Sequence, residues 1–392
     1  MKLGVIGLGY RMAAVLECLV KADPDIQVVA CVDPSPAGAP GLGRARIGIG
    51  TMYDTPDRML AAETLDLLLV GSPNHLHLEH VRAGLRAGVR VFTEKPVVVD
   101  ENQTLELAAL LREFGSDRVL VGLVLRYASL YKDLRAAQRA GHLGTIASIE
   151  ATEHIAPYHG AFFMRDWRRY QRFAGPYILE KCCHDLDIYA SVVGARAMTV
   201  ASFGGRKSFV PENAPVHLSN AEREMYHRKP SGWMASDHVF DGDADIIDYQ
   251  TALIEYANGA TMAFHANLNV PDQFRRFCIV GSNGMAEGDF IRNYFRVHDA
   301  RSGEKILETS YAGHEHNHYG ADDQMAFDLI DHFRNSTPLP VGVLDALEAG
   351  LTAIKIDEAR RTRRLVDLAE SWQRFDDALG SAMPRRAEGG SF

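Results

Sequence analysis

The sequence is poor in cysteine, and the few cysteines it has follow no pairing pattern. It holds five among 392 residues, at positions 18, 31, 182, 183 and 278. An odd number, with two adjacent and three scattered members, makes neither a disulfide framework nor a pair of CxxC metal-binding motifs. We therefore expect reduced thiols, most of them filling apolar positions.

Long apolar runs and an excess of positive charge are also missing. No apolar run approaches the roughly 20 residues that a membrane span requires. The first ten residues lack the apolar stretch and small-residue cleavage site of a secretory signal. The formal net charge is −9, which argues against a nucleic-acid binder, although several arginines crowd residues 165–172. We expect a cytoplasmic protein that binds neither membrane nor nucleic acid.

The N-terminal residues show an arrangement typical of dinucleotide binding. A short apolar run at 2–6 predicts a strand, and Gly7-Leu8-Gly9 follows it directly, ahead of a helical pattern. Gly7 permits a tight turn, and Gly9 lets the backbone approach a pyrophosphate. The helix then presents free N–H groups and its positive end to the phosphates. The predicted phosphate-binding residues are Gly7, Gly9, Tyr10, Arg11 and Met12.

The second predicted strand, 27–32, ends on Asp33, which we expect to accept hydrogen bonds from the adenosine ribose. Its charge would repel a 2′-phosphate and favours NAD over NADP, although Arg44 and Arg46 lie close in the sequence. Met12 stands where a small residue is usual, so the glycine motif is imperfect.

Strands and helices continue to alternate after Asp33. We predict strands at 67–71, 90–93 and 119–125 and helices at 78–87 and 101–114, which together indicate a parallel sheet. Ligands of such sheets bind at the carboxyl ends of the strands. Two polar clusters fall there, although two solvated turns would look the same. The predicted cofactor-binding residues of these clusters are Ser72, Asn74, His75, His77, Glu94 and Lys95.

Several motifs together resemble the glucose–fructose oxidoreductase, inositol dehydrogenase and rhizopine-catabolism (Gfo/Idh/MocA) family. They are Gly7-Leu8-Gly9, SPNHLH at 72–77, Glu94-Lys95-Pro96, GLVLRY at 122–127, GHLGTI at 141–146 and EKCCHDLD at 180–187. Later matches are LIEYANGATM at 253–262, VGSNGMAEGD at 280–289 and HYGADD at 318–323. The resemblance covers most of the chain and is specific for the family, but not for one substrate.

The resemblance implies an α/β protein of two domains, as the length also suggests. A Rossmann domain at 1–124 precedes an α+β domain at 125–392 with a large, mostly antiparallel sheet. That sheet carries the substrate pocket and is a common surface for forming dimers or tetramers. The sequence agrees, since segments 147–153, 200–203, 250–256, 261–268 and 277–280 are predicted strands. A late helix at 344–359 is expected to pack back near the first domain.

The resemblance also implies the catalytic residues. Lys95 lies near the nicotinamide and the reacting hydroxyl, and His184 relays the proton, as imidazole does near neutral pH. The usual acid four residues before the histidine is aspartate, whereas this chain has Glu180. We expect Glu180 to orient His184 or bind substrate hydroxyls; the alternative is that it pairs with Lys181 or a neighbouring arginine.

Lys181 has no counterpart in the general family pattern. It is a candidate to bind an anionic substituent, or else it points to solvent. Further substrate-binding candidates are Arg126, Tyr127, Trp167 and His318. Residues 205–245 are predicted to form a lid or a subunit-contact arm. His314, His316, His318 and Asp322 are types that bind zinc, yet hydride transfer needs no metal, and we predict none.

Two functions remain open from the sequence. The leading one is an NAD-dependent oxidoreductase acting on a hydroxyl of a sugar, inositol or sugar acid. The alternative is a glycoside hydrolase that keeps NAD bound and oxidises the sugar transiently, because it would use the same Lys95 and His184. A cofactor-binding protein without turnover would have no need of both.

Overall fold

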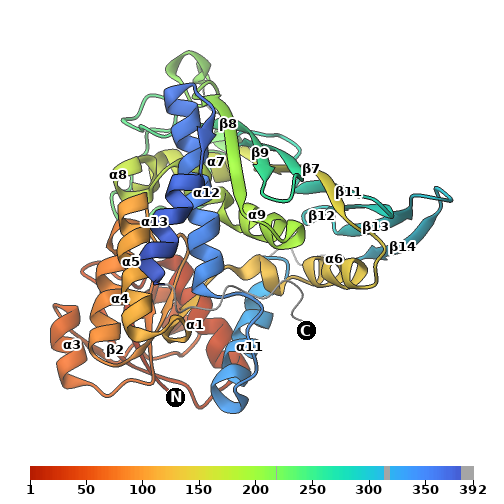
Figure 1. The fold of residues 1–392 in the computed structure, drawn as a ribbon. Coiled ribbons are helices and arrows are strands. Elements are labelled where there is room, and N and C mark those ends of the chain that lie inside the picture. The colour runs from red at the N-terminus through yellow and green to blue at the C-terminus, as the bar shows by residue number, and fades with distance from the viewer. Residues whose placement is uncertain (218, 313–317, 381–392) are drawn as a thin grey trace.

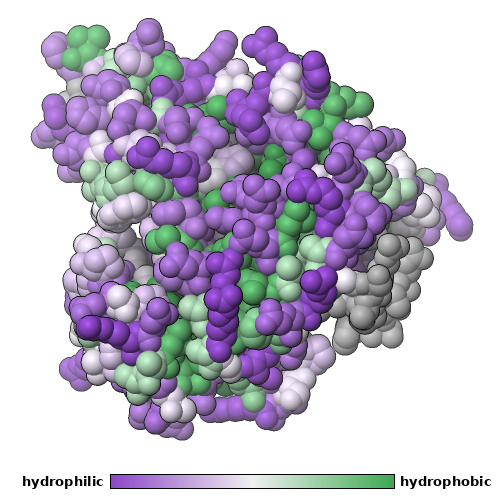
Figure 2. Space-filling view, turned by 60° about the vertical axis from the view of Figure 1, so that its left-hand side comes forward, coloured by the Kyte–Doolittle hydropathy of each residue, from purple (hydrophilic) through white to green (hydrophobic). Residues whose placement is uncertain are grey.

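The computed structural model describes residues 1–217, 219–312 and 318–380. It contains two sheets, one in each of the two regions expected from the sequence (Figure 1). No helix in the described part of the chain is long and apolar enough to cross a membrane. On the face drawn in Figure 2, hydrophilic side chains predominate and hydrophobic ones lie in patches between them.

The first sheet has six parallel strands and confirms the predicted Rossmann topology. Their order is β3 (Thr51–Met52), β2 (Gln27–Val32), β1 (Lys2–Ile6), β4 (Leu67–Val70), β5 (Arg90–Thr93) and β6 (Val119–Val121). The helices are α1 (Tyr10–Ala22), α2 (Ala39–Arg44), α3 (Pro56–Ala62), α4 (His77–Arg86) and α5 (Glu101–Phe114). Every residue of β4 is buried, because a parallel sheet is covered on both faces. Its continuous apolar run follows from that burial.

The predicted strand 119–125 was too long. It ends at Val121, and residues Val124–Tyr127 form a 3₁₀ turn instead. Within this turn the Arg126 guanidinium donates two hydrogen bonds, of 2.6 and 2.8 Å, to Asp187. An apolar run alone does not reveal this turn.

The second sheet has nine strands and is mostly antiparallel, as predicted. Their order is β14 (Lys305–Ser310), β13 (Tyr294–Asp299), β12 (Gly284–Asp289), β11 (Arg276–Gly281), β7 (Ile146–His154), β10 (Thr261–Asn267), β9 (Tyr249–Tyr256), β8 (Ala197–Gly205) and β15 (Val366–Asp367). Within this second sheet, β7 and β10 form the only parallel strand pair among the described residues. Side chains alternate along β10, where Met262, Phe264 and Ala266 are buried.

Helices cover one face of this sheet and connect it to the first domain. They are α6 (Ser129–Arg139), α7 (Pro157–Arg165), α8 (Gln171–Ala174), α9 (Tyr177–Val193), α10 (Asn220–His227), α11 (Ala321–Asn335), α12 (Val343–Thr362) and α13 (Ala369–Leu379). Helix α12 contacts α9 and β8 as well as α5, and α11 lies beside α1 (Figure 1). The C-terminal helices therefore hold α9, the helix of His184, against the Rossmann domain.

Candidate active site

The glycine turn has the geometry that its sequence predicts. Gly7 has φ +84°, and a Cβ there would lie 2.3 Å from the backbone nitrogen of Ser72. Gly9 caps α1 without a side-chain hydrogen bond, and a Cβ on it would meet nothing within 4 Å. Open space in front of uncapped helical N–H groups suits a phosphate.

Met12 departs from the small residue usual in this motif, and Gly71 compensates for it. The Met12 side chain is 1% exposed. Its terminal methyl group lies 2.7 Å from where a Cβ of Gly71 would be. The helix therefore keeps its close approach to the sheet, because the small residue stands on the opposite side of the contact.

Asp33 lies against the glycine turn at the end of β2. Its carboxylate accepts hydrogen bonds from the backbone N–H of Leu8 at 2.6 Å and of Ser35 at 2.7 Å. Arg44 and Arg46 are exposed and form no ion pair with Asp33 in the described part of the chain. The arrangement presents an anion, and no paired cation, where the adenosine ribose of a dinucleotide binds in this fold.

The polar cluster at 72–77 is tied to protein groups. His77 lies between the carbonyl oxygens of Ser72 and Pro96, both at 2.8 Å. The Ser72 hydroxyl contacts the ring of His80 at 2.9 Å. His75 packs on Phe173 with ring centroids 4.9 Å apart. The His77 ring thus ties the backbone at Ser72 to the turn that carries Lys95, and the contact of Ser72 and His77 with a cofactor stays a prediction.

Lys95 lies against α9, the helix that carries His184. The Lys95 ammonium donates to the backbone carbonyl of Glu180 at 2.6 Å and lies 4.0 Å from its carboxylate. His184 is buried, and its Nδ1 has no hydrogen-bond partner among the described residues. Burial, followed by the charge of Lys95, holds the pKa of His184 well below 6.5. The imidazole is therefore neutral and free to accept a proton.

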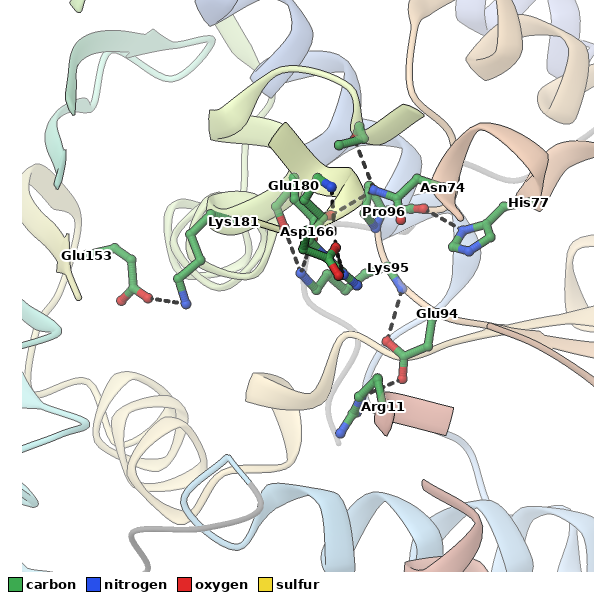
Figure 3. A network of polar contacts seen from close by, with 12 residues as sticks. Arg11, Asn74, His77, Glu94, Lys95, Pro96, Glu153, Asp166, Glu180 and Lys181 are labelled. Atoms are coloured by element: carbon green, nitrogen blue, oxygen red, sulfur yellow. Dashed lines mark hydrogen bonds and ion pairs between the residues drawn. The ribbon is translucent and has the colours of Figure 1, made fainter. Parts of the chain in front are cut away.

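Glu180 contacts Asn74 and Arg168 rather than His184. Its carboxylate accepts hydrogen bonds of 2.7 Å from the Asn74 amide and 2.7 Å from Arg168 Nε (Figure 3). Burial alone would raise its pKa, but Lys95 and Arg168 outweigh that effect and lower it. The expected contact with His184 one turn along the helix is thus not made. The alternative, pairing with a neighbouring arginine, is what the structure shows.

A second chain of ion pairs starts from Glu94. Arg11 donates to Glu94 at 2.8 Å and to Asp322 at 2.8 Å, and Asp322 contacts the His318 ring at 2.8 Å. Burial opposes ionisation of Asp322, but Arg11 and His318 overcome it and lower the carboxyl pKa. The rings of His318 and His184 are 6.1 Å apart. The chain therefore links the glycine turn to the vicinity of the candidate base.

Comparisons with known proteins decide the family. Residues 1–123 match the model described as oxidoreductase family, NAD-binding Rossmann fold, and residues 137–368 match its C-terminal alpha/beta domain. The chain belongs to the Gfo/Idh/MocA oxidoreductase family.

Two curated relatives span most of this family member. The Bacillus subtilis protein named as the oxidoreductase YteT is 23% identical over 78% of this chain and 81% of its own length. An Amycolatopsis mediterranei protein, named as the oxidoreductase subunit of a UDP-kanosamine synthase, is 30% identical over 79% of this chain and 80% of its own.

A solved structure shares the fold. It is scyllo-inositol dehydrogenase from Lactobacillus casei with bound NAD(H) and scyllo-inositol, with a TM-score of 0.71 at 18% identity. The match covers 94% of this chain and 99% of that one.

Lys181 belongs to a buried network that extends away from Lys95. Its ammonium pairs with Glu153 at 2.7 Å, and Glu153 pairs with Arg275 at 2.9 Å (Figure 3). Arg275 in turn makes two hydrogen bonds, of 2.6 and 2.8 Å, to Asp185. The solvent-facing alternative for Lys181 is therefore wrong, since its partner is a buried carboxylate.

The remaining candidates lie apart from Lys95 and His184. Arg126 is 5% exposed and gives its guanidinium to Asp187, and Tyr127 is buried beside it. Trp167 is buried with the Arg168 guanidinium 4.3 Å from its ring centre. The structure thus gives Arg126 a structural contact in place of the substrate contact expected from the sequence.

The structure also bears on the adjacent cysteines and on the candidate zinc ligands. Cys182 and Cys183 are buried free thiols, and burial raises the pKa of each. Within residues 1–217, 219–312 and 318–380, no group of three or more His, Cys, Asp and Glu side chains is placed to hold a metal. His314 and His316 lie outside the described residues.

Sequence reasoning missed the role of the arginines at 165–169. Arg165 donates to the carbonyls of Tyr226 at 3.0 Å and Lys229 at 3.4 Å, and Arg169 donates to that of Met234 at 2.6 Å. These arginines bind backbone carbonyls of the predicted arm, residues 205–245. Two features of the sequence could have indicated this role. Asp166 stands among the arginines of 165–169, and the arm contains many acidic residues, so the arginines could be expected to bind the arm.

Proposed function

We propose that the protein is an NAD-dependent oxidoreductase that transfers a hydride between nicotinamide and a hydroxyl of a sugar, inositol or sugar acid. One observation carries the proposal: the Lys95 ammonium contacts α9 at the Glu180 carbonyl, one helical turn before the buried, unpartnered imidazole of His184. Oxidation of a hydroxyl needs a group that accepts its proton and a cation near the developing alkoxide.

The residues present fit a dinucleotide. Gly7 makes the tight turn, Gly9 leaves open space for the pyrophosphate, and Asp33 offers its carboxylate to the ribose. When bound, NAD supplies the hydride acceptor. His184 takes the hydroxyl proton, Lys95 stabilises the alkoxide, and Glu180 fixes Arg168 and Asn74 around the pocket. The relative solved with NAD(H) and scyllo-inositol supports this class of substrate.

Steady-state assays distinguish the proposal from its alternative. The purified protein, given NAD and a panel of sugars, inositols and sugar acids, should form NADH in proportion to substrate consumed. A glycoside hydrolase would instead release a chromogenic aglycone with catalytic NAD and no net NADH. Release of that kind, without NADH formation from any free sugar, would refute the dehydrogenase proposal.

Asp33→Ala should relax the preference for NAD over NADP. Removing the carboxylate takes away both the ribose acceptor and the charge that repels a 2′-phosphate. The ratio of kcat/KM for the two cofactors should fall by about tenfold or more, the effect of one charged hydrogen bond. An unchanged ratio would assign the discrimination to another group, and Arg44→Ala and Arg46→Ala are the matched variants that identify it.

As the pH is lowered, the oxidation rate should begin to fall only below pH 6.5. Burial and Lys95 lower the pKa of His184 from its ordinary 6.5, so the imidazole stays unprotonated and able to accept a proton at that pH. We expect the acidic limb of a kcat/KM profile below pH 6.5, and its loss in His184→Gln. A limb centred at or above pH 6.5 contradicts this role of His184.

The open face of the second sheet is the proposed contact of a homo-oligomer. Phe203 is 69% exposed and Leu253 56% exposed there, which is unusual for large apolar side chains near one another on adjacent strands. A second copy of the chain would cover them. Light scattering of the purified protein tests this, with a monomeric mass as the contrary result.

A further inference from the structure

Lys229 is a pocket cation that lacks the acidic partner its neighbours have. Arg168 pairs with Asp166 and Glu180, and Lys181 pairs with Glu153. Across the described residues, no carboxylate lies within ion-pair distance of the Lys229 ammonium. The charged groups that act on it are Lys181, Arg168 and Lys95, all of them cations.

The side chain of Lys229 is nevertheless held inside the structure. Its ammonium lies 5.6 Å from the ring centre of Phe162. Burial, followed by the charges of Lys181, Arg168 and Lys95, lowers the pKa of Lys229 to about 7. An ordinary surface lysine would turn to water, where its charge is solvated.

The backbone around Lys229 is fixed, so the position of the lysine is built into the fold. The buried Arg165 guanidinium donates to the Lys229 carbonyl at 3.4 Å and to the Ser231 hydroxyl at 3.1 Å. The arm also returns to Arg165, whose carbonyl accepts from Ser236 N–H at 2.8 Å. Three residues after Lys229, Gly232 approaches Ala37 of the Rossmann domain, with 3.9 Å between their Cβ positions. The arm thus spans both domains and carries Lys229 to the pocket.

His159 of α7 lies beside the same Phe162 ring as Lys229, with the two ring centroids 6.5 Å apart. The charges acting on its ring are those of Lys181, Lys229, His318 and Lys95. Burial and these cations lower the pKa of His159 well below 6.5, which favours the neutral form of its ring. Lys181 and Lys95 each have a carboxylate nearby, whereas the Lys229 ammonium has none among the described residues.

We propose that Lys229, with His159 and the nearby charge of Lys181, forms a subsite for an anionic substituent of the substrate. The inference rests on the proposed function and narrows it. The substrate is a sugar that carries a carboxylate or a phosphate, rather than a neutral polyol. An oxyanion placed there would pair with the Lys229 ammonium. The attraction between the two charges is stronger in a site shielded from water than in bulk solvent.

The test compares Lys229→Met with the wild type on three matched substrates: a neutral hexose, the corresponding uronate and the corresponding hexose phosphate. The wild type should favour one or both anionic sugars. The variant should raise KM for them by about 10- to 100-fold, the loss of one charge-assisted hydrogen bond, with kcat and the neutral sugar little changed. Lys229→Arg should restore much of the effect. Comparison of the uronate with the hexose phosphate shows whether the subsite prefers a carboxylate or a phosphate.

Two further measurements make the result decisive. Lys207→Met, at an exposed lysine of the same arm, should leave every KM unchanged. Titration with NADH should give the same Kd for wild type and Lys229→Met; a weaker Kd would assign Lys229 to the dinucleotide phosphates and overturn the proposal. Equal effects on neutral and anionic sugars would also overturn it.

Failure of the proposed function has a different signature. If no sugar reduces NAD, the hydride-transfer proposal fails, and calorimetric titration with the uronate and the phosphate still tests Lys229. Binding that Lys229→Met abolishes would support the subsite without turnover. Binding of neither anion to the wild type would refute it.

Discussion

Lys95→Ala and His184→Ala should each bind NAD yet lose turnover by about 10²- to 10⁴-fold, the range for a group acting on a proton or charge in the transition state. Lys95 supplies the cation next to the developing alkoxide, and His184 supplies the buried, unpartnered nitrogen for the proton. Neither side chain lies at the glycine turn or Asp33. NADH binding, measured by fluorescence titration, should therefore stay close to that of the wild type while kcat falls.

Two controls guard this expectation against a loss of folding. Lys21→Ala removes an exposed lysine that pairs with Asp323 on the surface, and it should keep the full rate. Thermal unfolding of the Lys95 and His184 variants should remain cooperative. A near-normal rate in either variant would remove that residue from the chemistry.

Asp185→Ala should be the most destabilising single change in the pocket wall. Asp185 and Arg275 are almost fully buried, and the pair shares Glu153 with Lys181. Removing one partner of a buried pair leaves an uncompensated charge, at a cost of about 3–5 kcal/mol in the free energy of unfolding. Urea denaturation, monitored by far-UV circular dichroism, measures the change in midpoint.

The comparison variant is Glu308→Ala, which breaks an ion pair of the same type with Arg296. Both side chains of that pair are 40% exposed, so water replaces the lost contact. We expect no measurable shift of the midpoint. A shift as large as that of Asp185→Ala would mean that burial does not determine how much stability is lost when an ion pair is broken.

The sequence was a good guide wherever one local rule decides the structure. The run at 27–32 became β2 with the predicted bounds, and the helix at 101–114 became α5 without a change. Apolar burial and an N-cap aspartate suffice for these elements. The glycine turn was equally predictable, because positive φ at Gly7 is a local demand of the backbone.

Sequence patterns did not predict the contacts between segments that are distant in the chain. Glu180 had His184 one helical turn away, yet it contacts Asn74 and Arg168, since tertiary packing brings stronger partners than the helix offers. No sequence pattern marked Lys229 as a site residue, because its position depends on the hydrogen bond from Arg165 to its backbone carbonyl. The strand predicted at 119–125 ends at Val121, and Arg126, in the turn that follows, pairs with Asp187, distant in the chain.

Because Glu180 contacts groups of both domains, we expect the affinities for cofactor and sugar to be interdependent. Its carboxylate binds Asn74 of the Rossmann domain, and its carbonyl accepts from Lys95. The same carboxylate holds Arg168 of the pocket wall. A ligand that shifts one of these partners changes the position of the others. By thermodynamic reciprocity, the factor by which the dinucleotide tightens the sugar must equal the factor by which the sugar tightens the dinucleotide.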